Sequence, residues 1–197
     1  MILKKHCKLI LPDSGPINSL WVANRLDLLL ALNLPVIIID AVYDELTSDL
    51  AYGKDREVKA FIDRHLGTKI FIENTFIGQV AREKRLSGEF RTNEDIGEQA
   101  IIGFMSNQIK RYVENNDPFL LLYEDCDFEK VPKPDMAHMI TVAFLRRLEE
   151  VGIIDSAESI IHDMVCPRDP SVQARAFRDV PEGTEFEASG GSAFGPR

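Results

Sequence analysis

The chain has 197 residues, of which 45% are hydrophobic and 28% are charged, and its formal net charge is −9. This composition is typical of a soluble globular protein. It excludes a membrane-spanning one, because no apolar run approaches the roughly 20 residues that cross a bilayer. The three cysteines and four histidines lack the spacing of a disulfide framework or a zinc site. The start of the sequence lacks the apolar stretch of a signal peptide, so we expect a cytoplasmic protein.

The acidic balance, with 32 acidic against 23 basic residues, argues against a protein that binds nucleic acid through a basic surface. A site for divalent cations also needs several carboxylates, and these lower the net charge without preventing substrate binding once the metal is present. The net charge alone therefore excludes neither a protein that binds nucleic acid nor one that does not.

The first half of the chain predicts strands that alternate with helices. Residues 7–11 form an apolar run that ends at a turn, which indicates a buried strand, and the dense apolar pattern over 17–32 predicts a helix that Pro16 begins. Residues 36–40 are largely β-branched, and such a continuous apolar run is typical of an interior strand in a parallel sheet. The further elements expected in this half are helices over 42–46, 54–65 and 75–86 and a strand over 69–73.

The second half continues the alternation and then changes in composition. The elements expected here are a helix over 94–113 that Asn93 caps, a strand over 119–123, and helices over 134–151 and 156–164. This order predicts an α/β fold, a three-layer α/β/α sandwich with a central, mostly parallel sheet of four or five strands.

We expect one domain over residues 1–165 and a flexible tail over 166–197, because the tail is rich in Pro, Gly and Ser. Its isolated apolar residues fit a segment that folds on a partner protein, and simple disorder explains them equally well.

Acidic residues follow the predicted strands or begin the predicted helices. Asp13 follows the first strand, and Asp125 and Asp127 follow the fourth; Glu45 and Glu98 lie early in two helices. Each of them alone has an ordinary explanation as a turn former, a helix cap or solvated surface. Parallel sheets bind ligands outside the carboxyl ends of their strands, so we expect these carboxylates to meet at one edge, as a hard cation requires.

Four segments of the chain resemble, in order, the motifs of the PIN-domain family. The first begins with an aspartate and a small hydroxyl residue, the second joins a strand to a helix with a glutamate, the third has a Gly-Glu helix start, and the fourth carries an Asp-x-Asp pair before Val-Pro. The segments are residues 13–20, 38–46, 95–101 and 123–132, and together with the first strand they span 7–132. The predicted helices within 134–164 lie beyond these core motifs.

The resemblance implies a metal-dependent ribonuclease, in which carboxylates hold Mg²⁺ or Mn²⁺ and hydrolyse RNA phosphodiester bonds. It carries over Asp13, Glu45, Glu98, Asp125 and Asp127 as metal-binding and catalytic residues. Ser14 and Asn18 carry over as supporting polar residues. Many members of this family are toxins of toxin–antitoxin pairs, so the resemblance implies RNA as the substrate and adds a cognate antitoxin and a homodimer as candidate partners.

A basic stretch precedes the Glu98 helix and is a second candidate for RNA contacts. Its members are Arg82, Lys84, Arg85 and Arg91. Basic side chains bind phosphates through charge and hydrogen bonds, but a solvated helix end explains the same residues.

Two other functions fit parts of the sequence. The segment 120–127 resembles the strand and Asp-x-Asp motif of haloacid-dehalogenase-like phosphatases, although too little chain follows it to supply the later lysine and acidic pair. A PIN-like module that binds RNA or a protein without catalysis would keep the same acidic residues. Metal-dependent hydrolysis by the purified protein separates the nuclease from the binding module.

Overall fold

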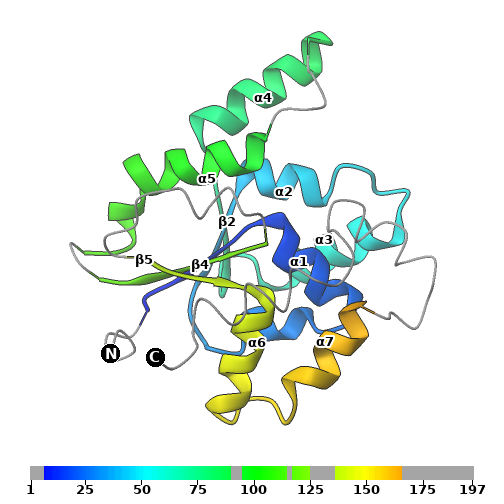
Figure 1. Ribbon diagram of the computed structural model, residues 1–197. Coiled ribbons are helices and arrows are strands. Elements are labelled where there is room, and N and C mark those ends of the chain that lie inside the picture. The colour runs from blue at the N-terminus through cyan, green and yellow to red at the C-terminus, as the bar shows by residue number, and fades with distance from the viewer. Residues whose placement is uncertain (1–6, 90–94, 115–116, 125–135, 166–197) are drawn as a thin grey trace.

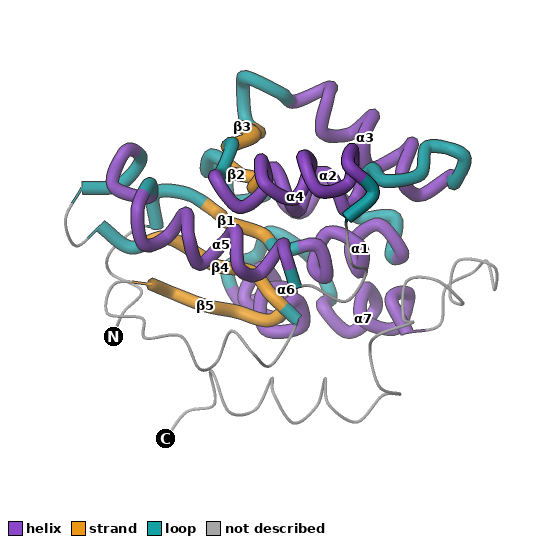
Figure 2. The backbone as a smooth tube through the Cα atoms, turned by 90° about the horizontal axis from the view of Figure 1, so that it is seen from above, coloured by secondary structure: helices purple, strands orange, loops and turns teal. Residues whose placement is uncertain are grey.

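A central sheet of five strands organises the protein, and its strands lie in the order β3-β2-β1-β4-β5 (Figure 2). The computed structural model describes residues 7–89, 95–114, 117–124 and 136–165. The strands are β1 (Ile10–Pro12), β2 (Val36–Ile39), β3 (Ile70–Glu73), β4 (Phe119–Tyr123) and β5 (Met136–Ile140). Every pairing in this sheet is parallel. The predicted α/β class is therefore confirmed, with a parallel sheet of five strands.

Helices cover the sheet and give the expected three layers. Figure 1 shows α4 and α5 above the sheet and α6 and α7 below it. The α-helices of the described segments are α1 (Ser14–Val22), α2 (Asp40–Leu46), α3 (Gly53–His65), α4 (Phe76–Ser87), α5 (Ile96–Asn107), α6 (Thr141–Glu150) and α7 (Ala157–Val165). Two short 3₁₀ helices, η2 (Leu26–Leu30) and η3 (Ile109–Arg111), add to them. None of the helices in the described ranges has the length and apolar character that a membrane crossing needs.

The core lies on both faces of the central strands. Every residue of β2 and of β4 is buried, which explains why these two runs are apolar without alternation. Phe104 of α5 and Phe144 of α6 are fully buried and fill the core from two helical layers. Burial of this kind stabilises the fold by about 25 cal/mol for each Å² of apolar surface removed from water.

The order of the strands fixes where a ligand site is expected. The chain runs outward from β1 to β2 and β3, and then returns across β1 to β4 and β5. The connections on the two sides of the β1–β4 pair therefore run in opposite directions. In open α/β sheets, ligands bind at this reversal, in the crevice outside the carboxyl ends of the strands.

The fifth strand corrects the prediction of a helix over 134–151. Residues 136–140 pair one by one with β4, from Phe119 opposite Met136 to Tyr123 opposite Ile140. Their sequence, Met-Ala-His-Met-Ile, is almost entirely apolar, and such a run fits a buried strand and a buried helix alike. The helix begins only at Thr141, where α6 starts.

Three further boundaries differ from the prediction. The helix expected over 17–32 starts earlier, at Ser14, and α1 ends at Val22, because Asn24 takes a positive φ of 55° and the chain continues as a 3₁₀ helix. The helix expected over 94–113 ends at Asn107 and is followed by η3. Asp40, expected as the last residue of a strand, is the first residue of α2.

Candidate functional site

Asp13 and Glu45 come from segments that the fold brings to the same edge of the sheet. Asp13 directly follows β1 and precedes α1, and its backbone N–H donates to the carbonyl of Leu122 on β4 at 2.8 Å. Glu45 lies in the last turn of α2, not early in its helix as predicted, because α2 already begins at Asp40. Ser14 Oγ donates to Glu45 Oε1 at 2.9 Å, so the predicted supporting serine does contact a predicted catalytic carboxylate.

Gly97 shows how closely these two carboxylates approach each other. It lies in the first turn of α5, and a Cβ built on it would lie 3.4 Å from Glu45 Oε2 and 3.8 Å from Asp13 Oδ1. The same Cβ would lie 3.6 Å from Val42 Cγ2, so the glycine leaves room for about one small group, bordered by two carboxylate oxygens and one methyl group. Like charges that share a site repel each other, and a cation between them offsets this repulsion.

Glu98 follows Gly97 in the first turn of α5 and is partly buried. A carboxylate in the first turn of a helix is favoured by the partial positive charge of the helix N-terminus. Within the described ranges, no three Asp, Glu, His or Cys side chains are grouped closely enough to hold a metal ion. Asp125 and Asp127, the other two predicted ligands, lie outside the described residues.

The chemistry of this edge nevertheless fits a hard divalent cation. Carboxylate oxygens are the ligands that Mg²⁺ and Mn²⁺ prefer, and Asp13 and Glu45 present one oxygen each toward the same open space. A side chain at position 97 would fill that space.

Glu124 is an acidic residue of this edge that the sequence did not single out. It directly follows β4, accepts a hydrogen bond from Ser19 Oγ of α1 at 3.0 Å, and accepts another from Thr141 Oγ1 of α6. Burial raises the pKa of its carboxyl group, and the two hydroxyl donors act in the opposite direction. The packing is close, since a Cβ at Gly15 would lie 3.1 Å from Glu124 Oε2. Glu124 is thus held between α1 and α6 at the end of β4.

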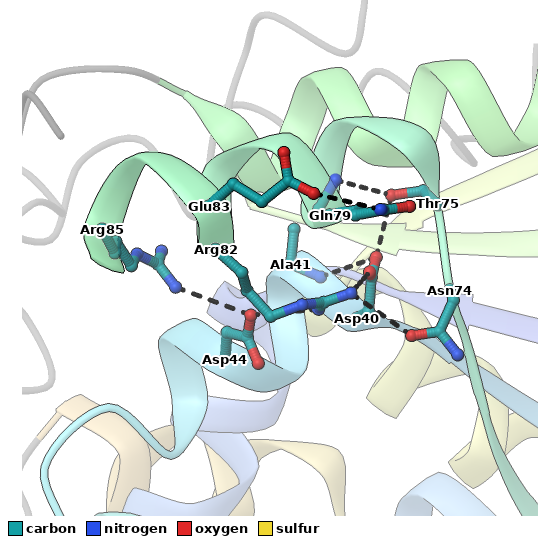
Figure 3. Close-up of polar contacts among 10 residues, drawn as sticks. Asp40, Ala41, Asp44, Asn74, Thr75, Gln79, Arg82, Glu83 and Arg85 are labelled. Carbon is teal, nitrogen blue, oxygen red and sulfur yellow. Dashed lines mark hydrogen bonds and ion pairs between the residues drawn. The ribbon is translucent and has the colours of Figure 1, made fainter. Parts of the chain in front are cut away.

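Asp40 is a second residue that sequence reasoning missed as a member of the site. It is 2% exposed, and its carboxylate accepts hydrogen bonds from Thr75 Oγ1 at 2.8 Å and from Arg82 Nη2 at 2.7 Å (Figure 3). Arg82 also donates to Asp44 Oδ2 at 3.2 Å. These contacts fasten α4 to α2, the helix that carries Glu45. The sequence shows that Asp40 follows four apolar residues, but its partners Thr75 and Arg82 are far away in the chain and are seen only in the structure.

The basic stretch divides into residues with different surroundings. Arg82 pairs with Asp40, and Arg85 Nη1 lies 3.5 Å from Asp44 Oδ2, so both guanidinium groups serve the contact between α4 and α2. Lys84 instead lines a pocket between α4 and α5. Arg91 lies outside the described residues.

Asn18 lies one turn after Ser14 on α1 and contacts α3. Its Oδ1 accepts a hydrogen bond from Lys54 Nζ of α3 at 3.1 Å, and the same ammonium group lies 3.4 Å from Asp55 Oδ1. This contact joins α1 to α3. The structure therefore gives Asn18 a role in packing these helices.

Fold and site together define an α/β protein that gathers carboxylates at the carboxyl ends of a parallel sheet. The sequence matches no protein-family model, and neither a curated protein nor a solved structure matches it. The function is therefore inferred from the geometry of this edge and from the motifs of the sequence.

Proposed function

We propose that the protein is a metal-dependent endoribonuclease. The observation that carries the proposal is the convergence of Asp13 Oδ1 and Glu45 Oε2 on the open space at Gly97. It occurs where β1 and β4 lie side by side and the direction of the connections reverses. Glu98, Asp125 and Asp127 complete the ligand set in this proposal, as the motif order implies.

Mg²⁺ or Mn²⁺ bound here would lower the pKa of a water molecule and neutralise charge that develops on the scissile phosphate. The protein's own residues orient the carboxylates for that task. The hydroxyl of Ser14 holds Glu45 Oε1, and Glu45 Oε2 lies against Gly97. Glu124, which directly follows β4, is tied to α1 and α6, and β4 pairs with β1.

RNA as the substrate follows from the PIN-domain resemblance, as do a toxin role and an antitoxin partner.

The ion pair between the buried Asp40 and Arg82 supports a rigid site, because α2 and α4 cannot shift independently without exposing a carboxylate that is now buried. Sites that position metal ligands on packed helices and strands keep the accuracy that catalysis requires.

The test is RNA cleavage by the purified full-length protein. Labelled single-stranded and structured RNAs are incubated with Mn²⁺, with Mg²⁺ or with a chelator, for the wild type and for Asp13→Asn. Asp63→Asn, which alters an exposed ion pair with Lys59 on α3, is the matched control. We expect metal-dependent cleavage that Asp13→Asn abolishes and Asp63→Asn retains.

Two results would contradict the proposal. One is cleavage that continues in chelator. The other is no cleavage together with no Mn²⁺ binding by calorimetry. Mn²⁺ binding without any cleavage would instead favour the non-catalytic binding module.

A further inference from the structure

A pocket of about 160 Å³ lies between α4 and α5, apart from the acidic edge. One face of α4 provides Phe76, Val80 and Lys84, and the first turn of α5 provides Ile96 and Gln99. α4 stands out from the body of the protein in Figure 1, and α5 runs beneath its first turns. The pocket therefore opens on a projecting part of the molecule.

The pocket and the acidic edge share the first turn of α5. Ile96 and Gln99 line the pocket, while Gly97, between them in the sequence, faces the carboxylates of Asp13 and Glu45. A residue advances about 1.5 Å along a helix axis, so the two sites lie within about one turn of each other along α5. Successive residues are about 100° apart around a helix, so Gly97 and the pocket-lining Ile96 and Gln99 lie on different faces of α5, and one RNA strand would reach both sites by passing around the start of the helix.

The side chains of the pocket offer three kinds of contact. Phe76 presents an aromatic ring that is 77% exposed, although most apolar side chains of this size are buried in the protein. Gln99 carries an amide with both donors and an acceptor, and Lys84 carries a cation. Proteins that bind unpaired nucleotides stack an aromatic ring on the base, hydrogen-bond the edge of the base with an amide, and neutralise the phosphate with a cation.

Contacts on the other side of α4 hold the pocket in shape. Arg82 joins the helix to the buried carboxylate of Asp40, and Thr75 Oγ1 caps its first turn by accepting from Gly78 N at 2.9 Å (Figure 3). Gly103 of α5 packs against Ile77 so closely that a Cβ there would lie 3.3 Å from Ile77 Cδ1. These contacts fix the relative position of the two helices that line the pocket.

We propose that this pocket binds one unpaired nucleobase of the RNA whose phosphodiester bond is cleaved at the acidic edge. Phe76 stacks on the base, Gln99 hydrogen-bonds its edge, and Lys84 contacts a neighbouring phosphate. The inference rests on the proposed ribonuclease function. An apolar side chain of a partner protein would also fill the space, but it would use neither the cation nor the amide.

The experiment measures binding of short single-stranded RNA to the Asp13→Asn protein in Mg²⁺ by fluorescence anisotropy, with one base at a time replaced by an abasic site. Phe76→Ala in this background should weaken binding by about 5- to 100-fold, as expected for the loss of one base stack. One abasic position should weaken binding to the parent protein and have no further effect on Phe76→Ala. Phe76→Trp should retain affinity, because it keeps the aromatic face, and Phe76→Leu should not.

Leu86→Ala is the matched control, because Leu86 is 89% exposed on the same helix and does not line the pocket. It should bind RNA like the parent protein, and urea unfolding of every variant checks the fold. The proposal is overturned if Phe76→Leu binds RNA like the parent protein. It is also overturned if every abasic position weakens binding to the parent protein and to Phe76→Ala by the same factor. If the wild type cleaves RNA and Phe76→Ala cleaves it equally well, only this inference fails. If the wild type neither cleaves RNA nor binds Mn²⁺, the proposed function fails as well.

Discussion

Arg82 Nη2 lies 2.7 Å from Oδ2 of Asp40, a carboxylate that is 2% exposed at the beginning of α2. The same aspartate accepts from Thr75, the residue that caps α4, so one buried side chain joins the starts of two helices. No room remains around it, because a Cβ at Gly78 would lie 2.3 Å from Asp40 Oδ1. The position of α2, and with it the position of Glu45, depends on this contact.

Arg82→Met should lower the free energy of unfolding by about 2 kcal/mol, because it leaves the Asp40 carboxylate buried without its cation. This value is below that of a fully buried pair, since the Arg82 side chain is 36% exposed. Arg85→Met is the control. Its ion pair with Asp44 spans 3.5 Å between two partly exposed groups, and such pairs contribute about 0.5 kcal/mol. Urea unfolding measures both variants, and equal effects would show that the buried pair has no special role.

Gly97→Ala should weaken metal binding without unfolding the protein. Alanine favours a helix over glycine by up to about 1 kcal/mol, so the variant should remain folded. Its methyl group would stand 3.4 Å from Glu45 Oε2 and beside Asp13 Oδ1, and we expect Mn²⁺ affinity to fall by about tenfold or more. Gly103→Ala on the same helix meets only the end of the Ile77 side chain and should leave Mn²⁺ affinity unchanged. Calorimetry on both variants checks this, and unchanged affinity in Gly97→Ala would contradict the location of the site.

Ser14→Ala removes the hydroxyl that donates to Glu45 Oε1. Loss of a hydrogen bond that orients a metal ligand lowers affinity or activity by about 10- to 100-fold, and we expect an effect of this size on RNA cleavage. Ser87→Ala removes a serine hydroxyl whose bond to the carbonyl of Lys84 is exposed, and it should cleave at the wild-type rate. Equal rates for Ser14→Ala and the wild type would remove Ser14 from the site.

Glu124→Gln should change how stability depends on pH in protein kept free of metal by a chelator. Burial raises the pKa of Glu124 above 4.5, the value expected in the unfolded chain, so the native state binds this proton more tightly. The stabilisation from the protonated carboxyl is complete below the unfolded pKa and is lost as the pH rises through the native pKa. Glutamine stays neutral, so the free energy of unfolding of the variant minus that of the wild type should rise as the pH increases above 4.5. A difference that falls or stays constant above this pH would show that burial does not disfavour the charged form.

Most of the fold could be predicted because its strands have a strong local signal. The runs that became β2 and β4 are apolar at nearly every position and are bounded by turn residues, so they mark buried parallel strands without further information. The run that became β5 contains Ala137 and His138, has fewer β-branched residues than β2, and its sequence predicts part of a helix. Its pairing with β4 shows that it is a strand, so tertiary contacts decided this element.

The candidate site could be predicted in part, for a similar reason. Asp13 and Glu98 stand at the end of a strand and the start of a helix, positions that the sequence pattern locates well. The roles of Asp40 and Glu124 depend on partners far away in the chain, Arg82 for the first and Thr141 for the second. No local pattern shows such partners, so the structure alone identifies these two carboxylates as anchors.

The most direct test of the central claim is the rate of RNA cleavage as a function of Mn²⁺ concentration, for the wild type and for Glu45→Gln. If Asp13 and Glu45 hold the metal together, the wild type should saturate with Mn²⁺, and the variant should need at least about tenfold more Mn²⁺ or show no activity. Urea unfolding should show that the variant is folded. An identical dependence on Mn²⁺ for the two proteins would contradict a metal site at this edge of the sheet.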